Sequence, residues 1–177
     1  MPFIHEKFKL RPIQAEDNLS KLSLGRESYT PLKIFLRKAA LNFNQHNIAK
    51  TYVLVDGDAS VRVWGYITLM NSEIILNENQ RPQEIYASAR YEAFPAVKIA
   101  RLAIDKALQG QGYGKNLLEW TVTLVRDKIS SYIGCRFLVV DAKQDSISFY
   151  EKAGFSLFNT DIPDEHPLMF LDLNYVN

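Results

Sequence analysis

The most informative stretch of the sequence is Gln109-Gly110-Gln111-Gly112-Tyr113-Gly114-Lys115, because it lies directly between a strand-like run and an amphipathic helical run. Glycine at every second position lets the backbone turn its amide groups toward one point. A helix that follows adds unpaired N–H groups and the positive end of its dipole. We call residues 109–115 the glycine loop, and we expect it to bind a pyrophosphate. The simpler alternative is a turn from strand to helix that binds nothing.

Two better-known phosphate motifs do not fit the glycine loop. A Walker loop needs glycine five residues before Gly114 and Ser or Thr after Lys115, but Gln109 and Asn116 stand there. A dinucleotide fingerprint through Gly112 and Gly114 needs a third glycine at position 117, which is Leu117. The sequence therefore argues against both a P-loop and a Rossmann site.

The segments around the glycine loop predict an α/β fold. Residues 96–104 form a strand candidate before it, and apolar residues at helical spacing predict a helix to about Ile129 after it. Thr30 and Pro31 predict the N-cap and first turn of a helix that runs to about Phe43. The remaining expected elements are a hairpin of residues 51–55 and 61–70 around Asp56-Gly57-Asp58, a strand at 136–141, a short helix at 145–152 ended by Gly154, and a strand at 168–173.

Residues 71–95 contain Pro82, Pro95 and many polar side chains, and we assign them to connections with at most one short strand. This order of elements predicts a mixed central β-sheet flanked by helices. No repeat or linker interrupts the 177 residues, so we expect a single domain over 1–177.

Composition narrows the class of protein further. With 47% hydrophobic residues the chain can bury a core, and no apolar run approaches the roughly 18 residues of a membrane span. Cys135 is the only cysteine, and the start Met1-Pro2-Phe3-Ile4-His5-Glu6 lacks a signal-peptide pattern. His5, His46 and His166 show no metal-ligand spacing. We expect a cytoplasmic protein without a metal.

Charge is distributed unevenly along the chain. The net charge of +1 argues against a general nucleic-acid coat protein or a polybasic membrane binder. Residues 1–50 nevertheless carry net +5, residues 51–160 are balanced, and residues 161–177 carry net −4. A local basic surface in the first third is therefore compatible with the overall balance.

Two landmarks together resemble the GNAT superfamily of N-acetyltransferases. The first is the run Ile99-Ala100-Arg101-Leu102-Ala103-Ile104-Asp105 followed by Gln109, Gly112 and Gly114, and the second is Phe149-Tyr150-Glu151-Lys152-Ala153-Gly154-Phe155. The resemblance implies acetyl-coenzyme A as the acetyl donor, without a metal. It places the pyrophosphate on the amides of Gln109, Gly110, Gln111, Gly112, Tyr113, Gly114 and Lys115, and the pantetheine arm along Leu102, Ala103 and Ile104.

The same resemblance implies that Tyr150 protonates the departing thiolate of coenzyme A. A phenol with an ordinary pKa of about 10 is protonated at neutral pH and can donate as charge grows on sulfur. The alternative is a core aromatic beside Phe149 and Phe155. Lys143 stands where many family members place Asn to contact coenzyme A, so that contact is left open.

The sequence does not identify a general base. Asp105, Asp141, Glu92 and Glu73 are candidates, although each is more simply a solvated surface acid. A water molecule could serve instead, and no base is needed if the acceptor amine arrives neutral.

Further runs resemble the TacT-type branch of the superfamily, namely residues 32–40, 51–55, 65–69 and 100–105. Members of that branch are toxins that acetylate the α-amine of aminoacyl-tRNA, and an antitoxin, typically a ribbon–helix–helix protein, neutralises them. If that holds here, Lys33, Arg37 and Lys38 are the candidates for tRNA phosphates. Their alternative is an ordinary solvated helix face.

Two other functions stay open at this point. One is an acetyltransferase for a small amine or a protein N-terminus, and the other is an acyl-CoA-binding module without turnover. The sequence is compatible with a homodimer but does not decide it.

Overall fold

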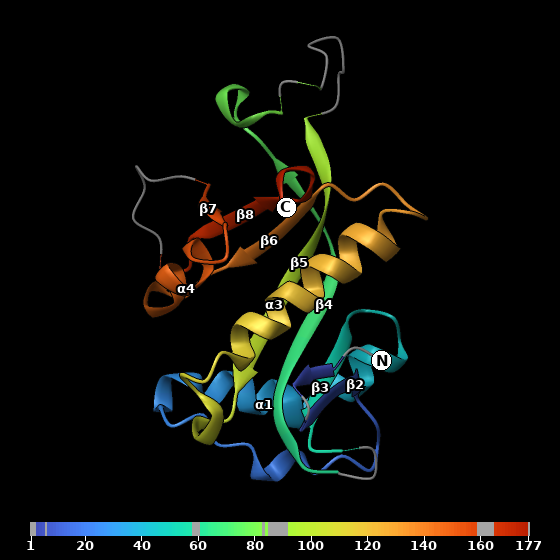
Figure 1. Ribbon diagram of the computed structural model, residues 1–177, viewed down its shortest axis with the longest axis vertical. Helices are drawn as coiled ribbons and strands as arrows, with labels where there is room; N and C mark the ends of the chain where they lie inside the picture. Colours follow the sequence, from blue (N-terminus) through green and yellow to red (C-terminus); the bar gives the residue numbers. More distant parts are fainter. Residues whose placement is uncertain are drawn as a thin grey trace. The chain divides into compact units, whose positions relative to one another are not determined.

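The computed structural model describes residues 3–5, 7–57, 61–82, 84, 92–158 and 165–176. The chain forms two compact units, unit 1 from residues 1–70 and 99–121 and unit 2 from residues 71–98 and 122–177. Strands β4 (Val63–Ile75) and β5 (Ala93–Ile104) and helix α3 (Tyr113–Leu124) each contribute to both units (Figure 1). Neither unit is a continuous piece of chain, and the single domain over 1–177 stays a prediction.

Unit 1 contains a sheet with the strand order β1–β2–β3–β4–β5. Strand β1 (Phe3–His5) pairs with β2 (Phe8–Pro12), and β2 pairs with β3 (Lys50–Val55), both antiparallel. Strand β3 pairs antiparallel with β4 from Lys50↔Leu69 to Val55↔Val63. The predicted hairpin is therefore confirmed, although Asp58 of its turn lies outside the described residues.

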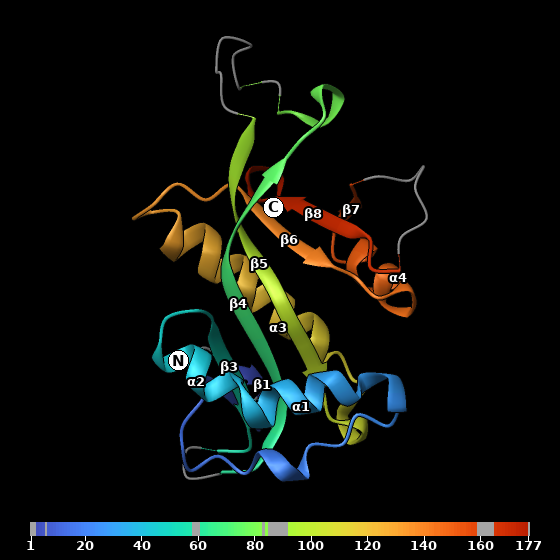
Figure 2. The same ribbon diagram turned by 180° about the vertical axis from the view of Figure 1, so that it is seen from behind.

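Helices cover both faces of this sheet (Figures 1 and 2). On one face lie α1 (Thr30–Lys38) and α2 (Ala40–Gln45), whose Leu36 and Ala40 join the core cluster of the sheet. On the other face, Tyr113 of α3 packs edge-on against Phe8, with 5.1 Å between ring centroids. Three short 3-10 turns complete unit 1: η1 (Leu19–Lys21), η2 (Glu27–Tyr29) and η4 (Lys106–Leu108).

The predicted helix over residues 30–43 is two helices rather than one. The backbone at Ala39 leaves helical geometry, with a φ of −126°, while its N–H still donates to the Phe35 carbonyl at 2.9 Å. The predicted cap is also wrong, because η2 leads straight into α1 and makes Thr30 its first helical residue.

Unit 2 contains the order β4–β5–β6–β8–β7. Strand β6 (Phe137–Asp141) pairs parallel with β5 over Ala96, Val97 and Lys98, and antiparallel with β8 (Leu168–Asp172). These two orientations confirm the predicted mixed sheet. The other elements are η3 (Glu78–Gln80), the π turn η5 (Val125–Ile129), η6 (Gln144–Ser146), α4 (Ile147–Glu151), β7 (Ser156–Leu157) and η7 (Leu173–Tyr175).

The connection predicted at residues 71–95 is shorter than expected. Strand β4 continues to Ile75 and β5 begins at Ala93, so the strands extend into it from both sides. Within its described part there is only the turn η3 and no additional strand. Residues 83 and 85–91 lie outside the described chain.

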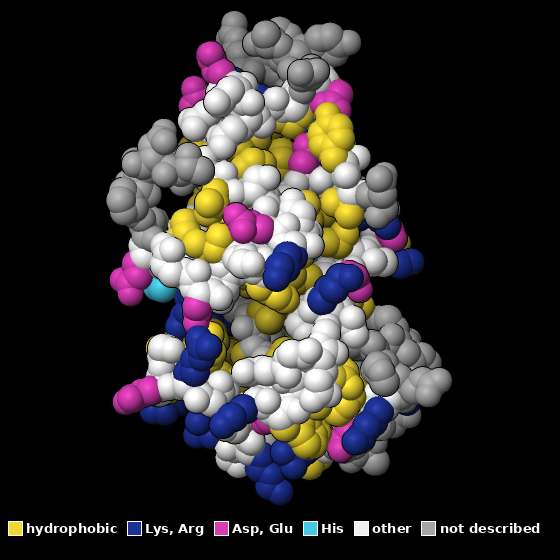
Figure 3. Space-filling model, turned by 60° about the vertical axis from the view of Figure 1, so that its left-hand side comes forward, with side chains coloured by type: hydrophobic (Ala, Val, Ile, Leu, Met, Phe, Trp, Pro, Cys, Tyr) yellow, Lys and Arg dark blue, Asp and Glu magenta, His cyan; other side chains and the backbone are white. Residues whose placement is uncertain are grey.

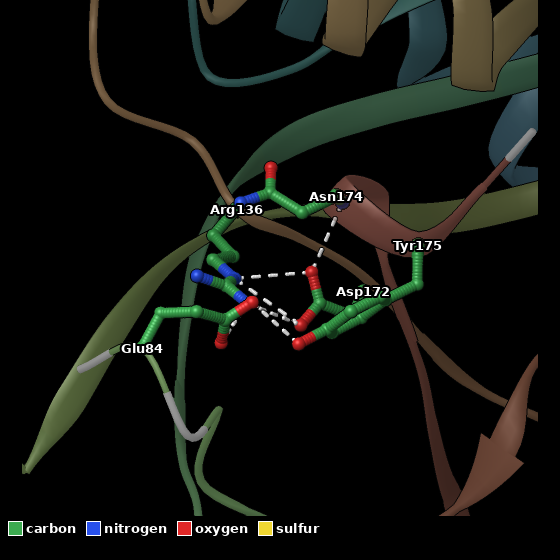
Figure 4. Close-up of polar contacts among 5 residues, drawn as sticks. All are labelled: Glu84, Arg136, Asp172, Asn174 and Tyr175. Atoms are coloured by element: carbon green, nitrogen blue, oxygen red, sulfur yellow. Dashed lines mark hydrogen bonds and ion pairs between the residues drawn. The ribbon is translucent and has the colours of Figure 1, made fainter.

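A polar cluster fixes the C-terminal turn of unit 2 (Figure 4). Arg136, at the start of β6, donates from Nε and Nη2 to the carboxylate of Asp172 at 2.9 to 3.2 Å. Asp172 also accepts the Asn174 N–H at 3.1 Å, and the Tyr175 hydroxyl donates to Glu84. The hydrogen bond from Tyr175 is the main reason that the pKa of Glu84 lies below its ordinary value.

Two kinds of feature are absent from the described residues. No helix in them is long and apolar enough to cross a membrane. They also contain no group of three or more His, Cys, Asp or Glu side chains placed to hold a metal ion.

Tyr66→Phe tests the contact between α1 and the sheet in unit 1. The Tyr66 hydroxyl donates to the Leu32 carbonyl at 2.8 Å, and its removal should lower the free energy of unfolding by about 1 kcal/mol. Burial raises the pKa of Tyr66, and Arg101 offsets part of that rise. Above about pH 10 the unfolded chain ionises this tyrosine and the folded chain does not, so stability falls as pH rises further.

Phenylalanine cannot ionise, so the variant does not lose this stability. The difference in free energy of unfolding between the variant and the wild type should therefore become smaller from about pH 8 to about pH 11. Urea unfolding at both pH values measures it. Tyr132→Phe is the control, because that side chain is 91% exposed and its replacement should leave stability unchanged. A constant difference across pH would contradict the assignment.

Candidate functional site

The glycine loop of unit 1 has a conformation that requires glycine at two positions. Gly110 and Gly112 have φ angles of 76° and 86°, in the left-handed region that other residues rarely adopt. A Cβ atom placed on either glycine would meet nothing within 4 Å. The backbone at both positions is therefore open to a close approach by a ligand.

The last three residues of the loop belong to the first turn of α3. The first α-helical hydrogen bond runs from the Asn116 N–H to the Gly112 carbonyl at 3.0 Å. The N–H groups of Gly114 and Lys115 precede it, in the first turn, where a helix itself supplies no acceptor. The expected helix N-terminus is present, but it lies within residues 109–115 rather than after them.

The side chain of Gln109 forms hydrogen bonds that hold the glycine loop to the rest of unit 1. Its Nε2 donates to the Ile104 carbonyl at 2.9 Å and to the Leu24 carbonyl at 3.3 Å. Gln111 donates likewise to the Ala107 carbonyl at 2.8 Å. Lys115 forms an exposed ion pair with Glu119 at 3.3 Å. Of these side chains, Gln109 thus holds the strand end and the loop together.

Asp105 is not the solvated surface acid that the sequence suggested. It is only 3% exposed, and its carboxylate accepts the N–H groups of Ser23 at 2.9 Å and Ala107 at 3.0 Å. Among the other candidate bases, Glu73 and Glu92 are exposed and Asp141 forms an ion pair with Lys98. The capping role of Asp105 had a sequence signal, because Asp is a preferred residue directly before a helical turn, where its carboxylate accepts an N–H from within the turn.

The strand residues Leu102, Ala103 and Ile104 form the end of β5, and Asp105 and η4 connect them to the glycine loop. In unit 1, β5 is the last strand of the sheet, with β4 on one side. Gly65 of β4 permits this packing, because a Cβ there would lie 3.0 Å from the Ala103 carbonyl oxygen. The parallel ladder to β6 extends only from Ala96 to Lys98, so residues 99–104 form a strand edge of unit 1.

The three predicted cations lie on α1 but differ in their surroundings. Lys33 is half-buried and Lys38 is exposed. Arg37 donates from Nε to the Leu19 carbonyl at 3.3 Å and from Nη2 to the Ser20 carbonyl at 2.6 Å. The predicted solvated face therefore contains one side chain that is already engaged in the fold.

Arg101 is a candidate that the sequence reasoning missed. It is exposed on β5, and its guanidinium carbon lies 5.0 Å from the ring centroid of Phe35 on α1. Figure 3 shows Lys and Arg side chains spaced over one face of the molecule, with Asp and Glu side chains beside several of them. The available signal was its place in residues 99–105, the strand-like run that precedes the glycine loop.

Tyr150 lies in α4 of unit 2. It is 6% exposed, and its ring packs edge-on against Phe149 at 5.0 Å and Phe155 at 5.5 Å between centroids. Burial raises its pKa above the ordinary value, so the phenol stays protonated at neutral pH. Gly154 ends this segment with a φ of 90°, as the sequence predicted.

Comparison with known proteins adds a family to this geometry. Residues 49–157 match the acetyltransferase (GNAT) domain family. A solved structure of a KacT mutant is 26% identical, with a TM-score of 0.81 and coverage of 96% of both chains.

Two structures of AtaT also match. AtaT complexed with acetyl-methionyl-tRNAfMet is 25% identical, with a TM-score of 0.79 and coverage of 94% of this chain and 95% of that one. A mutant AtaT toxin bound to the C-terminus of the antitoxin AtaR and acetyl-CoA is 23% identical, with a TM-score of 0.74 and coverage of 96% and 95%.

Proposed function

The chain belongs to the acetyltransferase (GNAT) family, and we propose that its acceptor is the α-amine of an aminoacyl-tRNA. The resemblance noted in the sequence is thus confirmed for the family, and the protein is an N-acetyltransferase. One observation carries the acceptor: the chain matches AtaT over almost its full length, and that protein was solved with an acetylated aminoacyl-tRNA.

The donor is acetyl-CoA in this proposal, and residues of unit 1 fit it. Its pyrophosphate meets the N–H groups of the glycine loop, where the open space beside Gly110 and Gly112 admits a close approach. Its extended pantetheine arm pairs with the free edge of β5 at Leu102, Ala103 and Ile104. The α3 dipole adds favourable interaction with the negative charge.

Acetyl-CoA supplies a thioester whose carbonyl carbon the acceptor amine attacks. As the carbon–sulfur bond breaks, Tyr150 donates its phenolic proton to sulfur, and the amine releases one proton to solvent or a base. Burial raises the pKa of Tyr150, so the phenol is protonated at neutral pH and holds a proton to donate. None of the candidate carboxylates is assigned as the base.

The acceptor's phosphates are met by cations of unit 1 in this proposal. Lys38 is exposed, Lys33 is half-buried and Arg101 is exposed beside α1, so these three side chains are available to a polyanion. Toxin activity would require an antitoxin, and AtaR fills that place for AtaT. We propose a ribbon–helix–helix protein as the corresponding partner.

Turnover against a panel of acceptors tests the proposed function. Release of coenzyme A with aminoacyl-tRNA, and none with deacylated tRNA or polyamines, is the expected result. Turnover on small amines or peptide N-termini alone would show that the acceptor is one of these amines and not aminoacyl-tRNA. Tight acetyl-CoA binding without turnover on any amine would mean that the protein is a binding module.

Tyr150→Phe should lower kcat about a hundredfold or more and leave the affinity for acetyl-CoA nearly unchanged. The physical reason is that the proton is donated only in the transition state. Steady-state kinetics with the accepted amine and calorimetry with acetyl-CoA separate the two quantities. Equal losses in both would assign Tyr150 to packing between Phe149 and Phe155 instead.

Gly112→Ala should weaken acetyl-CoA binding about tenfold, because a φ of 86° strains a residue with a Cβ by roughly 1–2 kcal/mol. Gly112→Asp should weaken it further by adding negative charge beside the pyrophosphate. Gly134→Ala is the matched control, since a Cβ there meets nothing within 4 Å and no left-handed backbone is involved. Unchanged binding in both Gly112 variants would remove the loop from the donor site.

A further inference from the structure

Residues 19–25 of unit 1, which we call the brace, contact the glycine-loop region at one end and α1 at the other. We infer that the brace holds the glycine loop in its binding shape, with Asp105 and Arg37 as positioning residues at its two ends. This inference rests on the proposed acetyl-CoA site. Neither residue needs to touch the donor or the reacting atoms.

At the loop end, the brace is joined by a set of converging hydrogen bonds. The Ser23 N–H donates to the Asp105 carboxylate at 2.9 Å, and the Lys106 N–H donates to the Ser23 carbonyl at 2.7 Å. Gln109 of the glycine loop donates to the Leu24 carbonyl at 3.3 Å. The chain before the loop and the loop's first residue are therefore both tied to the brace.

Asp105 is central to this end because it serves two backbone donors at once. One carboxylate oxygen accepts from Ser23 and the other accepts from Ala107 in η4. Hydrogen bonds to an ionised acceptor are stronger than neutral ones, and this acceptor is 3% exposed. Asp105 thus fixes the path of the chain between Ile104 and Gln109.

Arg37 provides the connection at the other end. Its Nε and Nη2 donate to the consecutive carbonyls of Leu19 and Ser20 in η1. These carbonyls belong to the first turn of the brace, which Asn18 caps by accepting the Ser20 N–H at 3.2 Å. Arg37 therefore links α1 to the brace.

The middle of the brace is anchored in the core of unit 1. Leu22 and Leu24 are each 2% exposed and belong to the same cluster as Leu36 of α1 and Ala103 of β5. Gly25 closes the segment with a φ of 76°, and a Cβ there would lie 2.9 Å from Cδ of Lys106. A segment fixed at both ends and in the middle has little freedom to shift, so it can define the position of the loop.

Asp105→Ala tests the loop end. The variant should bind acetyl-CoA about tenfold more weakly by calorimetry without an acceptor, because two amide contacts are lost. Asp105→Asn keeps one acceptor oxygen, so its affinity for acetyl-CoA should lie between those of Asp105→Ala and the wild type. If Asp105→Ala does not fold, Asp105→Asn serves as the test. Asp172→Ala is the matched control, since it also removes a capping carboxylate but in unit 2, and it should leave the affinity unchanged.

A second donor separates loop positioning from general loosening. S-acetylpantetheine lacks the pyrophosphate, so kcat/KM with it should be the same for wild type and the Asp105 variants. Loss of kcat/KM with both donors would indicate a structural role only and overturn the inference. Loss confined to acetyl-CoA would support it.

Arg37→Ala tests the α1 end and decides between two roles for this side chain. If Arg37 is a positioning residue, its replacement by alanine should weaken acetyl-CoA binding about threefold to tenfold when no acceptor is present. If Arg37 only contacts phosphates, the substitution should change only the KM for the acceptor. That result would overturn the inferred positioning role of Arg37. Arg81→Ala is the control, because Arg81 also donates to a backbone carbonyl, that of Leu76 in unit 2.

The outcomes also separate this inference from the proposed function. If wild type binds acetyl-CoA and both variants bind it equally well, the brace is wrong and the donor site stands. If the wild type binds no acetyl-CoA, the proposed donor site is wrong, and the inference about the brace is wrong as well.

Discussion

A buried carboxylate at the end of a strand, that of Asp105, sets the direction in which the chain leaves the sheet of unit 1. Removing an ionised group from water is unfavourable unless hydrogen bonds compensate, and here the amides of Ser23 and Ala107 do so. The carboxylate joins a segment more than eighty positions earlier to the turn that follows β5. The left-handed glycines Gly110 and Gly112 can expose their amides because the chain reaches them along a fixed path.

Much of the fold could be predicted from hydrophobic pattern and turn residues. Strands β3, β6 and β8 and the α3 helix follow their patterns closely, because most of their apolar side chains are buried. Strand β2 gave no such signal, since Arg11 is only 8% exposed and is held by an ion pair with Asp17. A buried charge whose partner lies outside its own strand interrupts the apolar pattern of that strand.

The candidate site was predictable to a similar extent and for similar reasons. The glycine spacing and the residues around Tyr150 are local in sequence, so they could be found without a structure. The surroundings of Asp105 and Arg37 depend on residues 19–25, which carry no motif and gain their meaning only from contacts across the fold. Arg101 was overlooked because a charged residue within a predicted strand says nothing about which side chains lie beside it.

Strand β5 keeps its length for a reason that follows from its two sets of partners. Its residues 96–98 pair with β6, and six residues after Lys98 the strand ends at Ile104. The next residue, Asp105, donates its N–H to the Trp64 carbonyl of β4 at 2.7 Å. Because side chains alternate along a strand, one inserted residue in residues 99–101 would turn Leu102 and Ile104 to the opposite face while leaving the ladder intact. Evolution can therefore exchange side chains along this stretch but cannot readily change its residue count, so insertions and deletions among relatives should fall elsewhere.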